Sequence, residues 1–75
     1  MRIHIEHTDT FGGVSNYGWV RRSTHECNTT LQAVRIAKKF AQCTGRKTRK
    51  EDYGDLIALY PAGLCQVIFI TFDYD

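Results

Sequence analysis

The chain has 75 residues, 43% of them hydrophobic, and its ten basic and eight acidic side chains leave a net charge of +2. This length provides for one hydrophobic core, and the composition is that of an ordinary globular protein, which argues against a multidomain or disordered chain. Because so small a domain buries only about 60% of its unfolded surface, a partner or a homodimer would add stability. We therefore expect a single compact domain over residues 1–75.

The sequence carries no membrane or export signal. No apolar run approaches the roughly 18 to 20 residues of a membrane span, and the N-terminal stretch lacks the apolar core of a signal peptide. The cysteines are odd in number and widely spaced, which fits free thiols in a reducing compartment: Cys27, Cys43 and Cys65. We expect a cytoplasmic protein without membrane contact.

Two strands are predicted in the first third of the chain. Residues 2–7 alternate between isoleucine and charged or polar side chains, as a half-buried strand requires. Residues 8–13 form a turn region with two glycines. A second strand, rich in aromatic and β-branched residues, begins at Val14 and is clearest over residues 19–23. The connection predicts a hairpin with an irregular loop.

Residues 28–45 are the clearest helix. Asn28 and Thr29 are N-cap types, Thr29 with Gln32 fits a capping box, and Gly45 is expected just past the last turn. A rotation of about 100° per residue sorts the segment into two arcs. The apolar arc, expected to be buried, holds Ala33, Val34, Ile36, Ala37, Phe40, Ala41 and Cys43. The polar arc contains no acid and holds Gln32, Arg35, Lys38, Lys39 and Gln42.

The last third of the chain predicts a basic loop and a hairpin. Residues 46–50 contain four cations, and acidic residues follow at once. Strands at 56–60 and 64–72 flank the turn at 61–63, where proline presets the first position and glycine can take a left-handed angle. The last strand is apolar on both alternations except at Gln66, so we expect it to be central in its sheet.

These elements predict an α+β fold in the order ββαββ: an antiparallel sheet of about four strands with one helix across one face. The strand order, and a further short strand in the basic segment, stay open. The expected core joins Ile3, Ile5, Leu56 or Ile57, Ile68 and Ile70 to Val34, Ile36, Ala37 and Phe40. Because one helix covers only one face, the other must be polar or carry an interaction patch.

Catalytic and metal chemistry find little support. A metal site needs several converging ligands, and the best set is His4, His7, His25 and Cys27. On a strand, His4 and His7 would point to opposite faces. Cys27 lies near His25 and Glu26 in sequence, but sequence neighbours seldom form a nucleophile–base pair. No phosphate-binding loop surrounds the paired glycines. We therefore expect no cofactor, no metal and no enzymatic activity.

The remaining feature is surface charge. Nine of the ten cations lie on the second strand, on the helix and directly after it: Arg21, Arg22, Arg35, Lys38, Lys39, Arg46, Lys47, Arg49 and Lys50. If the post-helix segment folds back beside the helix, these side chains form a basic patch suited to phosphates or to an acidic protein surface. A solvated face is the simpler interpretation. The modest net charge and the lack of an aromatic RNA-binding signature or helix-turn-helix weigh against a strong nucleic-acid reader.

The segment 32–45, QAVRIAKKFAQCTG, resembles the helix of small phage-encoded anti-CRISPR proteins, particularly one that inhibits type I-F surveillance complexes. The pattern is Gln-Ala, Arg-Ile-Ala, a lysine two positions on, and a later cysteine and glycine. Here these residues are Gln32, Ala33, Arg35, Ile36, Ala37, Lys39, Cys43 and Gly45. The resemblance covers about a fifth of the chain.

The resemblance implies a non-enzymatic inhibitor that binds a protein subunit of a bacterial defence complex and blocks its engagement of nucleic acid. The nine cations named above would be its contact residues, with Tyr17 and Trp19 as aromatic anchors. Core or cross-strand packing is the simpler interpretation of these two aromatics. The alternative function is a small nucleic-acid-binding module that contacts the phosphate backbone of DNA or RNA through the basic helix face and loop.

Overall fold

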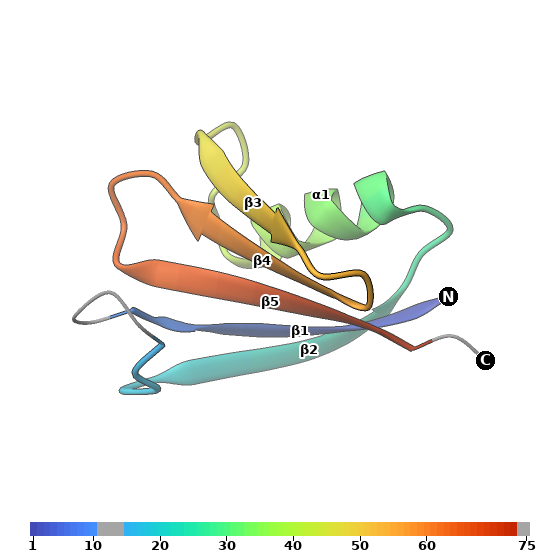
Figure 1. Ribbon diagram of the computed structural model, residues 1–75, viewed down its shortest axis with the longest axis horizontal. Coiled ribbons are helices and arrows are strands. Elements are labelled where there is room, and N and C mark those ends of the chain that lie inside the picture. The colour runs from blue at the N-terminus through green and yellow to red at the C-terminus, as the bar shows by residue number, and fades with distance from the viewer. Residues whose placement is uncertain (11–14, 74–75) are drawn as a thin grey trace.

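A computed structural model describes residues 1–10 and 15–73 as a five-stranded antiparallel sheet with one helix (Figure 1). The elements are β1 (Arg2–Asp9), β2 (Val20–Glu26), α1 (Thr30–Phe40), β3 (Thr48–Asp52), β4 (Leu56–Pro61) and β5 (Gln66–Asp73). The spatial order is β2-β1-β5-β4-β3. The expected α+β class is confirmed, as is the central place of the last strand. The expected four strands in the order ββαββ are corrected to five in the order ββαβββ.

The additional strand, β3, lies in the segment expected to be a basic loop. Its residues are mostly charged and give no apolar alternation, which is why periodicity favoured a loop. At the sheet edge both alternations can reach solvent, so charged side chains are tolerated and also discourage edge-to-edge pairing. A tight turn joins β3 to β4: Gly54, at φ +91°, donates its backbone N–H to Asp52 Oδ1 at 2.9 Å.

The helix begins where its caps predict and ends earlier than expected. Thr29 Oγ1 accepts the Gln32 backbone N–H at 3.1 Å, while Gln32 Oε1 accepts the Asn28 N–H at 2.7 Å. The capping box is thus confirmed. The expected end at Gly45 is wrong, because α1 stops at Phe40 and Gln42 takes the left-handed conformation with φ 59°.

The N-terminal hairpin is shifted relative to the expectation. β1 extends two residues further, to Asp9, and β2 begins at Val20 and continues to Glu26. The predicted strand start at Val14 and the glycines at 12–13 lie outside the described residues. The β1–β2 register is the regular antiparallel one, with Ile3 opposite His25 and Ile5 opposite Ser23.

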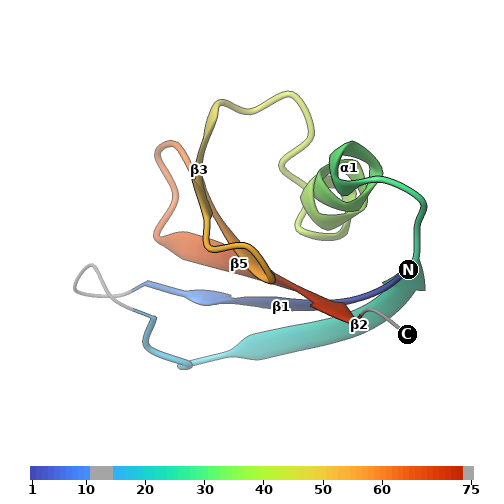
Figure 2. The same cartoon turned by 45° about the vertical axis from the view of Figure 1, so that its right-hand side comes forward.

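The core lies between α1 and the sheet, which curves around the helix (Figure 2). The sheet contributes Ile3, Ile5, Ile57, Leu59, Ile68, Ile70 and Phe72. The helix contributes mainly the small side chains of Ala33, Ala37 and Ala41, which let its backbone approach the sheet closely. Val34, Ile36 and Phe40, expected at the centre of this contact, are only partly buried along its margins.

Candidate functional site

The strand register assigns every strand residue to one of two faces. Side chains directly opposite each other share a face, so Arg21, Ser23 and His25 lie on the helix face with Ile3 and Ile5. The adjacent residues of β2, including Arg22, lie on the face turned away from α1, here called the open face. Arg21 and Arg22, neighbours in the chain, therefore lie on opposite faces of the sheet.

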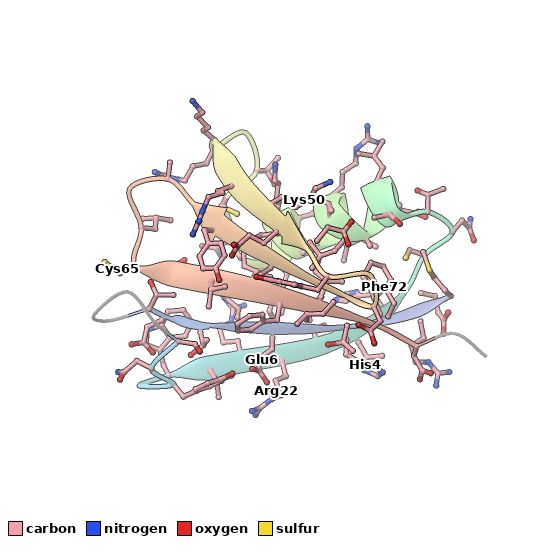
Figure 3. All side chains as sticks on the ribbon, viewed as in Figure 1. His4, Glu6, Arg22, Lys50, Cys65 and Phe72 are labelled. Carbon is pink, nitrogen blue, oxygen red and sulfur yellow. The ribbon has the colours of Figure 1, made fainter. Side chains whose placement is uncertain are left out.

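The cations of the open face are neutralised by carboxylates. Arg22 Nε lies 3.0 Å from Glu6 Oε2. Figure 3 labels these two side chains, which come from the neighbouring strands β2 and β1. Arg2 Nε lies 3.2 Å from Glu26 Oε1. Arg49 is 4.0 Å from Glu51 and also lies over the Tyr60 ring, 4.4 Å from its centroid. Arg22 and Arg49 were expected in the basic patch, but the structure places both on the open face with acidic partners.

The other seven predicted cations comprise Arg21 and Lys50 on the helix face of the sheet, three cations of α1, and two in the loop between α1 and β3. We call them the cationic side: Arg21, Arg35, Lys38, Lys39, Arg46, Lys47 and Lys50. Within residues 1–10 and 15–73, no carboxylate forms an ion pair with any of them. The helix itself carries no acid. Positive charge without an ion-pair partner among the described residues is thus concentrated on the helix, on the loop after it and on the helix face of the sheet.

Two cations of the cationic side flank a buried thiol between the helix and the post-helix loop. Desolvation raises the pKa of Cys43, and the positive charges of Lys38 and Arg46 oppose that shift without cancelling it. Arg46 also donates from Nη1 to the Ala62 carbonyl oxygen at 2.9 Å, which ties this loop to the β4–β5 turn. The loop therefore packs against the β4–β5 turn, with the Arg46 charge near Cys43.

The two aromatic residues expected as a contact pair are exposed, but they are on different faces. Trp19 is 40% exposed and packs edge-on against His7, with ring centroids 4.7 Å apart. His7 shares the helix face with Ile5. Tyr17 is 49% exposed and interacts with Glu6 on the open face. Hydrogen bonding to the Glu6 carboxylate raises the pKa of the Tyr17 hydroxyl.

The open face contains a shallow hollow of about 270 Å³ beside this tyrosine. It is lined by Glu6, Tyr17, Leu56, Phe69 and Thr71. Of these residues, only Tyr17 was predicted as a contact residue, and Leu56 was expected in the core, since partly buried residues on the second face of a central strand resemble core residues in sequence. Because Glu6 is occupied by Arg22 and Tyr17, the hollow offers a neutral, mixed surface.

A second depression, here called the edge groove, lies between α1 and the edge strand β2. It has a volume of about 350 Å³ and is lined by His25, Ile36, Lys39 and Phe40. The Arg21 guanidinium covers the Phe40 ring at 4.6 Å from its centroid. Sequence reasoning assigned Ile36 and Phe40 to the core. Their partial exposure here leaves an apolar floor with cationic side chains around it.

The structure separates the residues considered for metal or catalytic chemistry. His4 is exposed on the open face, near Thr24 and Asp73. His7 is buried and its Nε2 donates to Gln66 Oε1 at 2.9 Å. His25 Nε2 lies 2.6 Å from Ser23 Oγ. In the described ranges, no three histidine, cysteine or acidic side chains gather as metal ligands would.

No helix in the part of the chain that the structure describes is both long and apolar enough to cross a membrane. No protein-family model, curated protein or solved structure matches this chain. The function is therefore argued from the chain's own surfaces, among which the cationic side is the most strongly charged.

Proposed function

We propose that this protein is a non-enzymatic, phage-type inhibitor that binds a subunit of a bacterial CRISPR–Cas surveillance complex and blocks its engagement of nucleic acid. The helix resemblance suggests the target, and the cationic side supplies the contact surface. The protein would act in the host cytoplasm, and the free state of Cys27, Cys43 and Cys65 is consistent with that compartment. No cofactor or metal takes part.

The observation that carries this proposal is the segregation of charge. Three arginines, Arg2, Arg22 and Arg49, pair with glutamates of this chain, whereas the seven residues of the cationic side form no ion pair with any described residue. A surface that leaves its positive charges unpaired attracts an acidic partner and steers it into place. If these cations were only solvated surface residues, there would be no reason for them to be separated from the carboxylates.

The same charges constrain where the protein would dock. A channel that receives DNA is itself cationic, so the cationic side would be repelled from its floor. We therefore place the contact on an acidic surface of the subunit beside that channel. The bulk of the sheet would then block nucleic acid sterically, without imitating it.

The second candidate function is direct binding of DNA or RNA phosphates. The unpaired cations of the helix and loop favour this function too. It differs in its salt dependence, because each neutralised phosphate releases counterions and the logarithm of affinity then falls with a slope of about −0.9 per contact. Docking on protein through fewer ion pairs would show a shallower slope.

The experiment is a pull-down with tagged protein from bacterial lysate, with and without nuclease, followed by mass spectrometry. We expect recovery of a defined surveillance-complex subunit that survives nuclease. The paired variant Lys38→Gln/Lys39→Gln, which lowers the net charge from +2 to 0, should lose most of that recovery. Its matched control, Ser15→Glu/Tyr53→Glu, makes the same change at exposed loop positions outside the cationic side and should retain it.

Equal loss in both variants would show that net charge alone matters. Equal retention in both, with each variant folded by circular dichroism, would remove the helix cations from the contact. Recovery of nucleic acid alone, abolished by nuclease, would establish the phosphate-binding function in place of the inhibitor.

A further inference from the structure

The strand β2 ends the sheet, and no helix or strand of residues 1–10 and 15–73 lies along its outer side (Figures 1 and 2). We propose that this edge binds an extended acidic segment of a partner protein, which adds to the sheet as a further antiparallel strand and places its side chains in the edge groove. The inference deepens the proposed function and rests on it only in taking the partner to be a protein.

The backbone of β2 shows which groups are available. Met1 and Cys27 exchange two hydrogen bonds, Cys27 N to Met1 O at 2.9 Å and the Met1 amino group to Cys27 O at 2.8 Å. In an antiparallel ladder such pairs alternate, so every second residue from Cys27 backward faces β1. The intervening residues point their N–H and C=O groups outward: Val20, Arg22, Thr24 and Glu26. Within the described part of the chain, no hydrogen bond satisfies these outward backbone groups.

The edge groove lies on the helix-face side of this free edge. An incoming strand would place alternate side chains opposite Arg21, Ser23 and His25, which share the helix face. Those side chains would meet the apolar floor made by Ile36 and Phe40. Main-chain hydrogen bonds would supply affinity and the groove would supply selectivity, as in other cases of strand addition.

Charge decides the kind of strand. Arg21 and Lys39 line or border the groove, and neither has an acidic partner among the described residues. An acidic side chain opposite Arg21 and another beside Lys39 would complete both pairs, while an apolar residue between them would cover the Phe40 ring. The fitting segment alternates acid, apolar and acid on one face.

A second copy of this chain fits the same edge poorly. Antiparallel pairing of two β2 strands about Ser23 would place Arg21 opposite His25 and would bring the two lysines at position 39 toward each other. The paired lysines would be like charges held close together, which is destabilising. The charges that protect this edge from self-association thus select an acidic strand.

The probe is a peptide as long as β2, acetyl-Thr-Glu-Thr-Leu-Thr-Glu-Thr-amide, titrated into the ¹⁵N-labelled full chain. Its leucine would lie opposite Ser23 and its glutamates opposite Arg21 and His25. We expect amide shifts and slowed hydrogen exchange at the outward residues Arg22 and Thr24. A peptide with lysine in place of glutamate should bind at least about tenfold more weakly. Absence of binding, or equal binding of both peptides, would overturn the proposal.

Methylation of peptide nitrogens tests strand addition without altering the protein. In the antiparallel arrangement, the threonine N–H groups face β2 and the leucine N–H faces solvent. N-methylation of the two central threonines should weaken binding about tenfold, since it removes hydrogen bonds to the edge. N-methylation of the leucine should change it less than about twofold. The reverse pattern, or no difference, would exclude the proposed geometry.

Two protein variants locate the site. Lys39→Gln should weaken the glutamate peptide about two- to fivefold, the range for a partly exposed charge pair. Its matched control, Leu31→Glu, lowers the net charge equally at an exposed helix position and should leave binding unchanged. Thr24→Pro removes an outward donor that β1 does not use and should abolish binding. If Thr24→Pro fails to fold, the N-methylated peptides still decide the question.

The peptide titration and the pull-down can fail independently. Peptide binding without recovery of a defence-complex subunit would support the edge site and reject the inhibitor. Recovery of the subunit by a chain whose β2 amides stay unaffected by both peptide and subunit would reject the edge site and leave the proposed function in place.

Discussion

The Arg21 guanidinium lies over the Phe40 ring, 4.6 Å from its centroid, and so connects the edge strand β2 to the last turn of the helix. His25, two residues along on the same face, approaches the same ring edge-on with a centroid distance of 6.4 Å. The Phe40 ring therefore projects from α1 toward the edge strand β2 and does not lie in the centre of the core. This contact shapes the edge groove.

We expect Arg21 and Phe40 to be energetically coupled. Arg21→Lys keeps the charge but loses planar stacking, and Phe40→Leu removes the ring. A double-mutant cycle, measured by urea unfolding, should give a coupling of about 0.5–1 kcal/mol. Phe40→Leu alone should lower the free energy of unfolding by only about 1 kcal/mol, because the ring is partly exposed. Strict additivity of the two changes would show that the ring and the guanidinium do not interact in solution.

The helix–sheet contact should not tolerate a larger side chain. Ala37 has no exposed surface and faces the isoleucines of the sheet. Ala37→Leu should lower the free energy of unfolding by about 1–3 kcal/mol, because the added atoms push the helix away from the sheet. The comparison is Arg35→Leu, which places the same side chain on the exposed side of α1 and should shift stability by less than about 0.5 kcal/mol. Similar midpoints in thermal unfolding for both would contradict the packing described here.

Two substitutions in the segment after the helix should change the free energy of unfolding in opposite directions. Gln42 holds a left-handed φ of 59° and Gly45 a φ of +84°. Gln42→Gly should raise the free energy of unfolding by about 0.5–1 kcal/mol, since glycine takes this conformation without strain. Gly45→Ala should lower it by a similar amount, about 1 kcal/mol, by introducing that strain. Chemical denaturation of both variants at one pH checks the pair, and equal signs would be inconsistent with the backbone angles.

Asp9 should contribute to the loss of unfolding free energy at low pH. Desolvation raises the pKa of this carboxyl, but hydrogen bonds from the Asn16 side chain and the backbone N–H groups of Gly18 and Trp19 outweigh it and leave the pKa below 3.8. The folded state then binds fewer protons than the unfolded state. The resulting stability is complete above about pH 4 and is lost as pH falls through the folded pKa.

Asp9→Asn should therefore flatten the fall in stability below about pH 4, measured by urea unfolding at each pH. Asn16→Ala, which removes one of the donors, should flatten it partially. An acid slope that is the same in all three proteins would mean that Asp9 titrates alike in the folded and unfolded chains.

The three thiols should differ sharply in reactivity. Cys65 is exposed, whereas Cys27 and Cys43 are buried, and desolvation raises the pKa of Cys43. Because the thiolate is the reactive form, a disulfide reagent should label one thiol per chain quickly and the other two only on unfolding. Cys65→Ser should abolish the fast phase. Rapid labelling of more than one thiol in the native protein would show that the helix side opens readily.

Several elements could be read directly from the sequence because they depend on near neighbours in the chain. The capping box at Thr29 and Gln32 is a contact across one turn, and the alternation of β1 follows from the two-residue repeat of a strand. The apolar character of β5 on both alternations correctly indicated its central place. β3 was left open because an edge strand needs no apolar pattern. The early helix end was missed because Gln42, a residue with no glycine-like signal, already takes a left-handed angle three residues before Gly45 does.

The sequence by itself determined the α+β class, the start of the helix, the central strand and the inventory of nine cations after Arg2. Which cations are free was decided only by the tertiary structure. Pairing of β1 with β2 brings Glu6 to Arg22, and the folding of the helix over one face leaves Arg21 on the other side of the sheet from its neighbour. The physical reason is that ion pairs and grooves join residues distant in sequence, and only strand register and helix placement set those distances.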